Sequence, residues 1–270
     1  MTDQYFLVAP KIIPGEALSS WIHRVCQSHG ISVKRLYSQI NLDTPQDIDS
    51  EKFPEAILNL MSMTRHDTEN FRLVKAVNRS IGLTESLRKQ IRKGTDHSPT
   101  TAFCWQCLKT DTTPYYRIEW RFHFWHTCPK HLVDMLTRCP YCLMMPNLNG
   151  ALLVSNNAVP SLAFCYSCQF FFGDSKQLIH AEFDVSLTEK IQLQQGMMAG
   201  VVYGYYKIRP STKRLPLESM FQLYASGLLC PGIKYSNSQP AELGDEILSR
   251  FLDLLDKQSS FKNGHEVSLP

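Results

Sequence analysis

The sequence predicts a mainly α-helical fold with a few small β elements at its centre. Apolar residues recur at helical spacing within the first hundred residues and again beyond residue 187, and four pairs of cysteine or histidine lie between these stretches. A chain of 270 residues that is 43% hydrophobic can form two or three modules with buried cores. We expect an N-terminal helical domain, a tandem metal-binding module, a C-terminal helical domain and a flexible tail, over residues 1–100, 101–175, 176–257 and 258–270.

The N-terminal domain begins with a helix-turn-helix pattern. Four apolar residues share one face of an expected amphipathic helix: Leu18, Trp21, Ile22 and Val25. Gly30 is placed to end this helix, and Ser32 can cap a second helix with apolar residues at the same spacing. If the pair binds DNA, Lys34 and Arg35 would face the groove or its phosphates. A plain helical hairpin without any contact to nucleic acid has the same pattern.

Further helices are expected in both helical domains. In the N-terminal domain they cover residues 53–63 and 68–80 and a segment that Thr84 caps. In the C-terminal domain the apolar spacing predicts helices over residues 187–200, 217–226 and 243–257. The polar end of the chain, punctuated by glycine and proline, is expected to fray.

Four short motifs place soft metal ligands in pairs. They are Cys104 with Cys107, Cys128 with His131, Cys139 with Cys142, and Cys165 with Cys168. The two-residue spacing lets both members of a pair contact one ion, and alternate pairs lie about twenty residues apart, as in structural zinc sites. We therefore expect two four-coordinate, structural Zn²⁺ ions. Cys26 and Cys230 are left over, and a reducing compartment explains this cysteine usage better than a disulfide framework does.

The four pairs can be grouped in two ways, sequentially or as an interleaved cross-brace. We favour sequential grouping into two tandem zinc ribbons, because each loop between paired motifs can then hold a small hairpin. The expected strands cover residues 115–120 and 121–125, and a last ribbon strand and turn follow the fourth pair. His123 or His126 could replace His131 as a ligand. Thiolate-rich zinc sites are closed, so a structural role is expected rather than a catalytic one.

The net charge of +3 predicts no general attraction to nucleic acid, but two local basic clusters occur. The first comprises Arg88, Lys89, Arg92 and Lys93, and the second comprises Lys207, Arg209, Lys213 and Arg214. Each cluster is a candidate contact to nucleic acid or to a partner, and a solvated helix face is the simpler alternative. The longest nearly apolar stretch, residues 197–206, is too short to span a bilayer, so we expect a cytoplasmic protein.

No catalytic constellation stands out in the sequence. It lacks a glycine-rich phosphate loop, a Ser/His/Asp arrangement and acidic residues spaced for two-metal phosphoryl chemistry. The one strong constellation is the thiolate-rich set, which favours a binding or adapter role over an enzyme. The enzymatic alternative is a zinc-dependent ligase of the ubiquitin type, which would require cross-brace ligation.

Two parts of the chain resemble a known family. The run at residues 14–24, PGEALSSWIHR, followed by Gly30, is similar to the opening helix of TniQ/TnsD proteins, the target-selection subunits of certain bacterial DNA transposons. The metal-binding region resembles the family's signature in order and spacing, through Leu108, Asp111, Tyr115, Tyr116, Arg117, Trp120, Cys128-Pro129 and Arg138-Cys139-Pro140. The resemblance covers residues 10–170, more than half of the chain.

The resemblance implies a non-catalytic protein of DNA transposition, similar to the TniQ of a CRISPR-associated transposon. Such a protein is an adapter between a Cascade-type CRISPR effector, carrying guide RNA and target DNA, and a TnsC-type AAA+ ATPase that brings the transposase. It implies a homodimer that acts at DNA in a bacterial cytoplasm. The C-terminal helices match no motif of the family. The alternative is a TnsD-like protein that binds its DNA site directly through the helix-turn-helix and the basic clusters.

Overall fold

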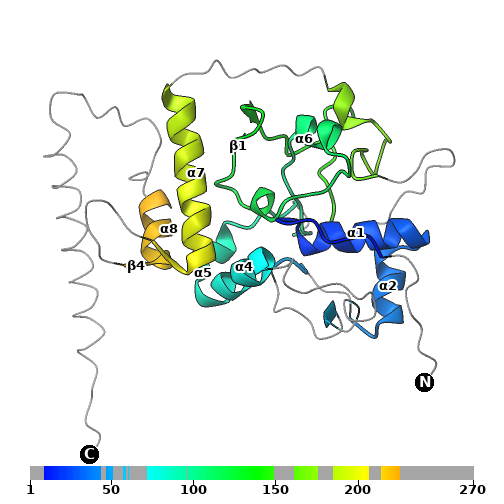
Figure 1. Cartoon of the computed structure of the whole chain (residues 1–270), viewed down its shortest axis with the longest axis horizontal. Helices are drawn as coiled ribbons and strands as arrows, with labels where there is room; N and C mark the ends of the chain where they lie inside the picture. The colour runs from blue at the N-terminus through cyan, green and yellow to red at the C-terminus, as the bar shows by residue number, and fades with distance from the viewer. Residues whose placement is uncertain are drawn as a thin grey trace, which may run out of the picture. The chain divides into compact units, whose positions relative to one another are not determined.

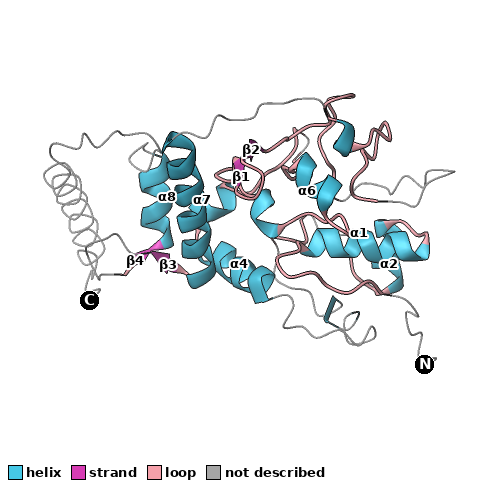
Figure 2. Ribbon diagram, turned by 45° about the horizontal axis from the view of Figure 1, so that its top comes forward, coloured by secondary structure: helices cyan, strands magenta, loops and turns pink. Residues whose placement is uncertain are grey.

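The computed structural model describes residues 9–43, 47–50, 57–58, 60, 72–95, 97–148, 161–175, 185–206 and 214–225, all within the first of two compact units, Met1–Pro231. The described part is mainly helical, as predicted (Figures 1 and 2). Its α-helices are α1 Leu18–His29, α2 Val33–Gln39, α4 Arg72–Leu83, α5 Glu85–Lys89, α6 Trp105–Thr110, α7 Val185–Tyr203 and α8 Leu217–Ala225. Its 3-10 helices are η2 Ile118–Arg121 and η3 Phe172–Asp174, and its strands are β1 Thr127–Cys128, β2 Val133–Asp134, β3 Tyr205–Tyr206 and β4 Leu215–Pro216.

Helix α1 is buried on all sides over its first nine residues, so the expected amphipathic pattern was wrong in its polar half. The polar residues stay buried because each has a partner. Ser20 Oγ donates to Glu16 and accepts from the backbone N–H of Tyr116, and His23 Nε2 lies 2.6 Å from the carbonyl oxygen of Leu148. The helix ends as predicted at Gly30, whose φ of 61° is the left-handed conformation that favours glycine.

Helix α2 follows after a short turn, and the predicted helix-turn-helix arrangement is confirmed at the level of its helices. The Ser32 side chain accepts a hydrogen bond from the backbone N–H of Arg35, which is the predicted cap. The buried face of α2 consists of Val33, Leu36 and Tyr37, and Lys34 and Arg35 are exposed. The two cations therefore lie on the solvent side of the second helix.

The remaining helices pack as α4 with α7 and α5 with α8, and α7 lies beside α8 (Figures 1 and 2). Ser80 Oγ of α4 donates to the Val201 carbonyl of α7 at 2.5 Å. Thr84 caps α5 as predicted, by accepting from the backbone N–H of Leu87. Strands β3 and β4 pair antiparallel between α7 and α8, with Tyr205 opposite Pro216. The predicted helices at 187–200 and 217–226 are thus confirmed.

Other predictions fall outside the described residues. These are the helix at 243–257, most of the helix at 53–63, and the tail. The domain boundaries at residues 100 and 175 also stay a prediction. Buried apolar residues from Ile12 to Phe221 belong to one hydrophobic cluster within the described part of the chain. None of the described helices combines the length and the apolar character needed to cross a membrane.

The strands predicted at 115–120 and 121–125 were wrong. This region forms the 3-10 helix η2 and isolated bridges, Glu16 with Arg117 and Ile91 with Phe122. The physical reason is burial on both sides: Trp120, Arg121 and Phe122 are consecutive and all buried, whereas a strand with one solvent face alternates buried and exposed residues. Near the fourth ligand pair, a single bridge between Phe164 and Phe171 leads into η3.

Candidate metal centres

The first cluster contains the side chains of Cys104, Cys107, Cys128 and His131. His131 Nδ1 lies 3.4, 3.3 and 3.6 Å from the sulfur atoms of Cys104, Cys107 and Cys128, and the sulfurs of Cys107 and Cys128 are 3.6 Å apart. A tetrahedral ion with Zn–S near 2.3 Å and Zn–N near 2.05 Å separates its ligand atoms by about 3.6–3.8 Å. The donor set and its spacing are therefore compatible with one structural zinc ion.

The second cluster contains four cysteines, Cys139, Cys142, Cys165 and Cys168. The sulfurs of Cys139 and Cys168 are 3.7 Å apart, and those of Cys142 and Cys165 are 3.6 Å apart. In each cluster all four ligand atoms lie within 4.8 Å of one another. This set is also compatible with a tetrahedral zinc ion. The structure thus brings the pairs together sequentially, first with second and third with fourth, rather than in a cross-brace.

Three of the four ligand pairs share one backbone turn. The residue after the second ligand has a positive φ in each: Leu132 at 57°, Leu143 at 60° and Gln169 at 61°. Its N–H donates to the carbonyl of the first ligand, four residues back, at 2.8–2.9 Å. This turn points both ligands of a pair to the same side, as the two-residue spacing predicts. The spacing does not predict which residue takes the positive φ.

The Cys104–Cys107 pair is built differently, because it opens helix α6. Cys104 is the N-cap of α6, and its sulfur accepts a hydrogen bond from the Cys107 N–H at 3.4 Å. The Cys128–His131 pair lies on the β1–β2 hairpin, where Cys128 pairs with Val133. Phe103 and Leu136 exchange two backbone hydrogen bonds, 2.8 and 2.9 Å, and so bring α6 to the hairpin.

Close thiols alter one another's ionisation. Hydrogen bonds from the thiols of Cys104 and Cys107 lower the pKa of Cys128, and the hydrogen bond with Cys104 is the largest of the effects that raise the pKa of Cys107. In the second cluster, burial raises the pKa of Cys165 to about 12. Since metal ligation needs thiolates, any divalent ion bound here must displace protons, and its affinity will rise with pH.

Arg117 braces the chain beside the first cluster. Its Nη2 lies 2.9 Å from Asp111 Oδ2, just after α6, and its guanidinium carbon lies 4.4 Å from the ring centre of Tyr115 and 4.7 Å from that of Trp120. Lys130 adds a longer contact to Asp111, at 3.7 Å. Tyr116 and Trp120 are buried in the core.

The other histidines near the first cluster have different surroundings. His126 Nε2 lies 3.2 Å from the hydroxyl of Tyr224 in α8, and its backbone N–H donates to Gln194 of α7. His123 is exposed. Partial desolvation of the rings and the neighbouring Arg92 lower the pKa of both imidazoles. It is His131 that the structure places among the sulfurs.

The predicted basic contacts that the structure describes have different surroundings. Arg88, Lys89 and Lys93 are exposed, with Lys89 forming a long surface pair with Glu85. Arg92 is buried and donates to the carbonyls of Phe122, His123 and Trp125, so its side chain holds the backbone near the first cluster. Arg214 is exposed and lies over the Tyr205 ring at 4.6 Å. Lys207, Arg209 and Lys213 lie outside the described residues.

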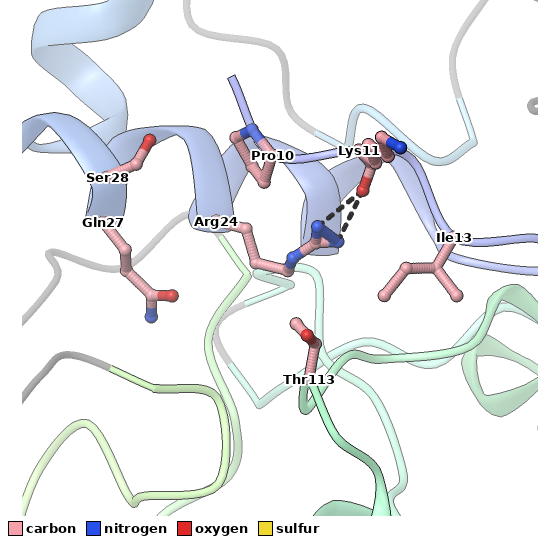
Figure 3. Close-up of a pocket in the computed structure, with 7 residues that line it drawn as sticks. All are labelled: Pro10, Lys11, Ile13, Arg24, Gln27, Ser28 and Thr113. Carbon is pink, nitrogen blue, oxygen red and sulfur yellow. Dashed lines mark hydrogen bonds between the residues drawn. The ribbon is translucent and has the colours of Figure 1, made fainter. Parts of the chain in front are cut away.

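A surface pocket of about 430 Å³ lies beside α1 (Figure 3). Its lining consists of Pro10, Lys11, Ile13, Arg24, Gln27, Ser28 and Thr113. The Arg24 guanidinium donates to the Lys11 carbonyl from Nη1 and Nη2, at 3.1 and 2.6 Å, and Nη1 also donates to Glu16 at 2.9 Å. These bonds tie the N-terminal segment to α1, so the guanidinium stabilises the fold at the edge of the pocket.

Residues 7–135 match the model of the TniQ family. Residues 7–135 are thus the TniQ-family part of the chain. The match contains α1, α2 and the complete first cluster, and it ends before Cys139, the first ligand of the second cluster. The TniQ match implies a role in target selection during DNA transposition, with partners in the transposition machinery. Among curated proteins, none matches the chain.

Proposed function

We propose that this TniQ-family protein is a non-catalytic adapter in transposition, built on two structural zinc ions. The observation that carries the proposal is the TniQ match over residues 7–135, which contains one complete set of four metal-type ligands whose ligand atoms all lie within 4.8 Å of one another. In this proposal Cys104, Cys107, Cys128 and His131 hold one Zn²⁺, and Cys139, Cys142, Cys165 and Cys168 hold the other.

The zinc ions would act on the fold rather than on a substrate. Four protein ligands fill the coordination sphere of each ion, which leaves no open position for chemistry. Zinc modules of this kind gain roughly 10–16 kcal/mol from binding the ion, which can replace the hydrophobic core that short segments lack. The regions around the ligands contain only two-residue strands and short helices in the described chain, so this contribution is needed there.

Metal content tests this part of the proposal. Native mass spectrometry should find two zinc ions per chain, and Cys107→Ser and Cys142→Ser should each lose one ion, the second leaving the first cluster loaded. Cys230→Ser serves as the control, because Cys230 belongs to neither cluster, and should keep both ions. Full occupancy in all three variants would contradict the assigned ligands.

As an adapter, the protein would connect an RNA-guided CRISPR effector of the Cascade type, with its guide RNA and target DNA, to a TnsC-type AAA+ ATPase and through it to the transposase. It would act as a homodimer at DNA in the bacterial cytoplasm. A scaffold with buried ion pairs and two metal centres suits this role, because an adapter must hold separate contact surfaces at constant spacing.

The test is affinity purification of the tagged protein from its own host at mild salt, with and without nuclease, followed by mass spectrometry. Nuclease-resistant recovery of CRISPR effector subunits together with the ATPase is the expected result. Recovery of the ATPase and DNA without any effector subunit would contradict the adapter and favour direct DNA recognition.

Direct DNA binding is the second candidate, and the exposed Lys34 and Arg35 on α2 favour it specifically. A DNA-binding surface there predicts an affinity that falls steeply with salt, because each phosphate contact releases counterions. Reversing both charges, Lys34→Glu with Arg35→Glu, should weaken DNA binding and flatten its salt dependence. The same reversal at two exposed cations outside the helix-turn-helix and the basic clusters, Arg79 and Lys190, is the matched control. An adapter would keep its target choice with α2 reversed.

A further inference from the structure

The second metal-type cluster carries an unusual exposed surface. Tyr141, Leu143 and Met144 are 74%, 64% and 46% exposed, and we call these three residues the knuckle patch. Only two other large hydrophobic residues of the described chain, Leu58 and Tyr203, are exposed. Three of five such residues therefore come from one turn of six residues. Scattered exposed apolar residues need no explanation, but a concentration of them marks an interaction site.

The turn holds the patch in a fixed geometry. The Leu143 N–H donates to the Cys139 carbonyl at 2.9 Å, and the Cys139 N–H donates to the Met144 carbonyl at 2.8 Å. The Tyr141 ring stacks on that of Phe170, with ring centres 5.8 Å apart and an angle of 4° between the planes. Phe170 follows the last cysteine pair, so both halves of the cluster support the aromatic ring.

The hydrogen bonds that the structure shows for Leu143, to Cys139 and from Arg138, involve its backbone and do not need a leucine side chain. Its φ of 60° is a conformation that a residue with a γ-branched side chain seldom adopts, and its side chain is mostly in solvent. Of the two equivalent positions, Leu132 has a φ of 57° with a half-buried side chain, and Gln169 has a φ of 61° with a polar, exposed side chain. Glycine would satisfy the backbone at position 143 without strain. At this position a leucine is unfavourable both because φ is positive and because its apolar side chain is exposed to water. Its presence there points to a contact with another molecule.

The charges around the patch indicate the class of that molecule. The described segments that carry the ligands of this cluster, residues 138–148 and 161–175, contain one cation, Arg138, and one carboxylate, Asp174. Arg138 is exposed, and its Nη1 donates to the Leu143 carbonyl at 3.2 Å, which fixes the guanidinium beside the patch. Nucleic acid binding relies on several cations per site, and a lone arginine next to four cysteines does not supply them. A carboxylate of a protein partner would match the one cation.

We propose that the knuckle patch docks an apolar segment of a protein partner, and that a carboxylate of this segment pairs with Arg138. Tyrosine, methionine and arginine are the residue types enriched where proteins bind one another. Leu143 at the centre of the turn would enter the partner's apolar side, and Tyr141 would offer its open ring face. The inference concerns the surface alone and holds under either of the two proposed functions.

The experiment is selection of twelve-residue peptides from a random displayed library on the full zinc-loaded chain, with counter-selection on the Leu143→Gly variant. The leading peptide is then synthesised, and its affinity is measured by fluorescence anisotropy. We expect the selected peptides to contain spaced apolar residues and at least one carboxylate. The Leu143→Gly variant should bind the leading peptide at least tenfold more weakly than wild type, and a tenfold loss corresponds to about 1.4 kcal/mol. The Arg138→Gln variant should also bind this peptide more weakly. A version of the peptide in which the carboxylate is amidated should bind Arg138→Gln and wild type with equal affinity.

The design separates docking from folding. Leu143→Gly relieves the backbone, so its thermal midpoint should equal or exceed that of wild type while its affinity falls. Gln169→Gly relieves the same strain on the same cluster and should bind the peptide as wild type does. A lowered midpoint in Leu143→Gly, equal peptide affinity in all variants, or failure to enrich any peptide would overturn the proposal. Binding of a single-stranded oligonucleotide that depends on Leu143 would also overturn it, because the patch would then bind nucleic acid. A dimer that sedimentation detects for wild type but not for Leu143→Gly would overturn it as well and assign the patch to a second copy of the chain.

Discussion

Arg121→Met tests how the N-terminal segment is joined to the metal-binding region. Arg121 lies in η2 and is 1% exposed. Its Nη2 lies 2.6 Å from Asp47 Oδ2, and its Nη1 lies 2.9 Å from Asp49 Oδ2. Asp49 also accepts hydrogen bonds from the backbone N–H and the hydroxyl of Ser19 in α1. Methionine keeps the apolar bulk of the side chain and removes the charge, so two buried carboxylates lose their cation.

The expected cost follows from this burial. Removing one partner of a buried ion pair typically destabilises a protein by about 3–5 kcal/mol, because the remaining charge stays desolvated. Burial already raises the pKa of Asp49, and Arg121 opposes that shift. Without Arg121 the pKa of Asp49 rises further. The ionised, buried carboxylate then destabilises the folded variant at high pH, and protonation of Asp49 removes this charge as the pH falls. The deficit of the variant should therefore shrink between about pH 8 and about pH 5.5.

The assay is urea unfolding of the zinc-loaded protein, followed by tryptophan fluorescence at both pH values. The triple variant Asp47→Asn, Asp49→Asn, Arg121→Met is the control, since it removes the carboxylate charges together with the cation and should recover much of the lost free energy of unfolding. A deficit below about 1 kcal/mol would place these groups in water, in conflict with their burial. An equal deficit at both pH values would show that Asp49 does not take up the proton.

Three further predictions concern α1 and its surroundings. Trp21→Ala should destabilise the protein by about 3–5 kcal/mol in the same assay, because Trp21 is fully buried and its Nε1 donates to the Pro10 carbonyl at 3.0 Å; a loss near zero would place the ring at the surface. Gly30→Ala should lower the thermal midpoint, because φ at this position is 61°. Gly82→Ala is the control: this position lies within α4, an added methyl meets nothing within 4 Å, and the midpoint should stay unchanged or rise. Equal shifts in the two variants would refute the conformational argument. Burial lowers the pKa of His23 from 6.5, so the unfolded chain takes up a proton that the folded chain does not, and stability is lost as the pH falls below about 6.5. His23→Gln should reduce this dependence of stability on pH. An unchanged slope of stability against pH would assign the loss to other groups.

Features set by neighbours along the chain were predictable from the sequence. The Ser32 and Thr84 caps and the end of α1 at Gly30 each depend on bonds that close within four or five residues. The pairing of ligands two residues apart has the same local origin, and the spacing therefore revealed the members of both clusters. The TniQ resemblance rested on these same local patterns.

Tertiary structure alone decided which polar residues are buried and where the aromatic segment bends. Arg92 belonged to a predicted basic surface, yet it donates to the carbonyl groups of Phe122, His123 and Trp125, about thirty positions away. Arg121 interrupts an aromatic run whose pattern predicted strands, because Asp47, 74 positions earlier, meets it inside the core. The grouping of the four ligand pairs was likewise open in the sequence. Local hydrogen bonds and spacing specify caps and ligand pairs, whereas burial of a charge depends on partners that only the folded chain brings together.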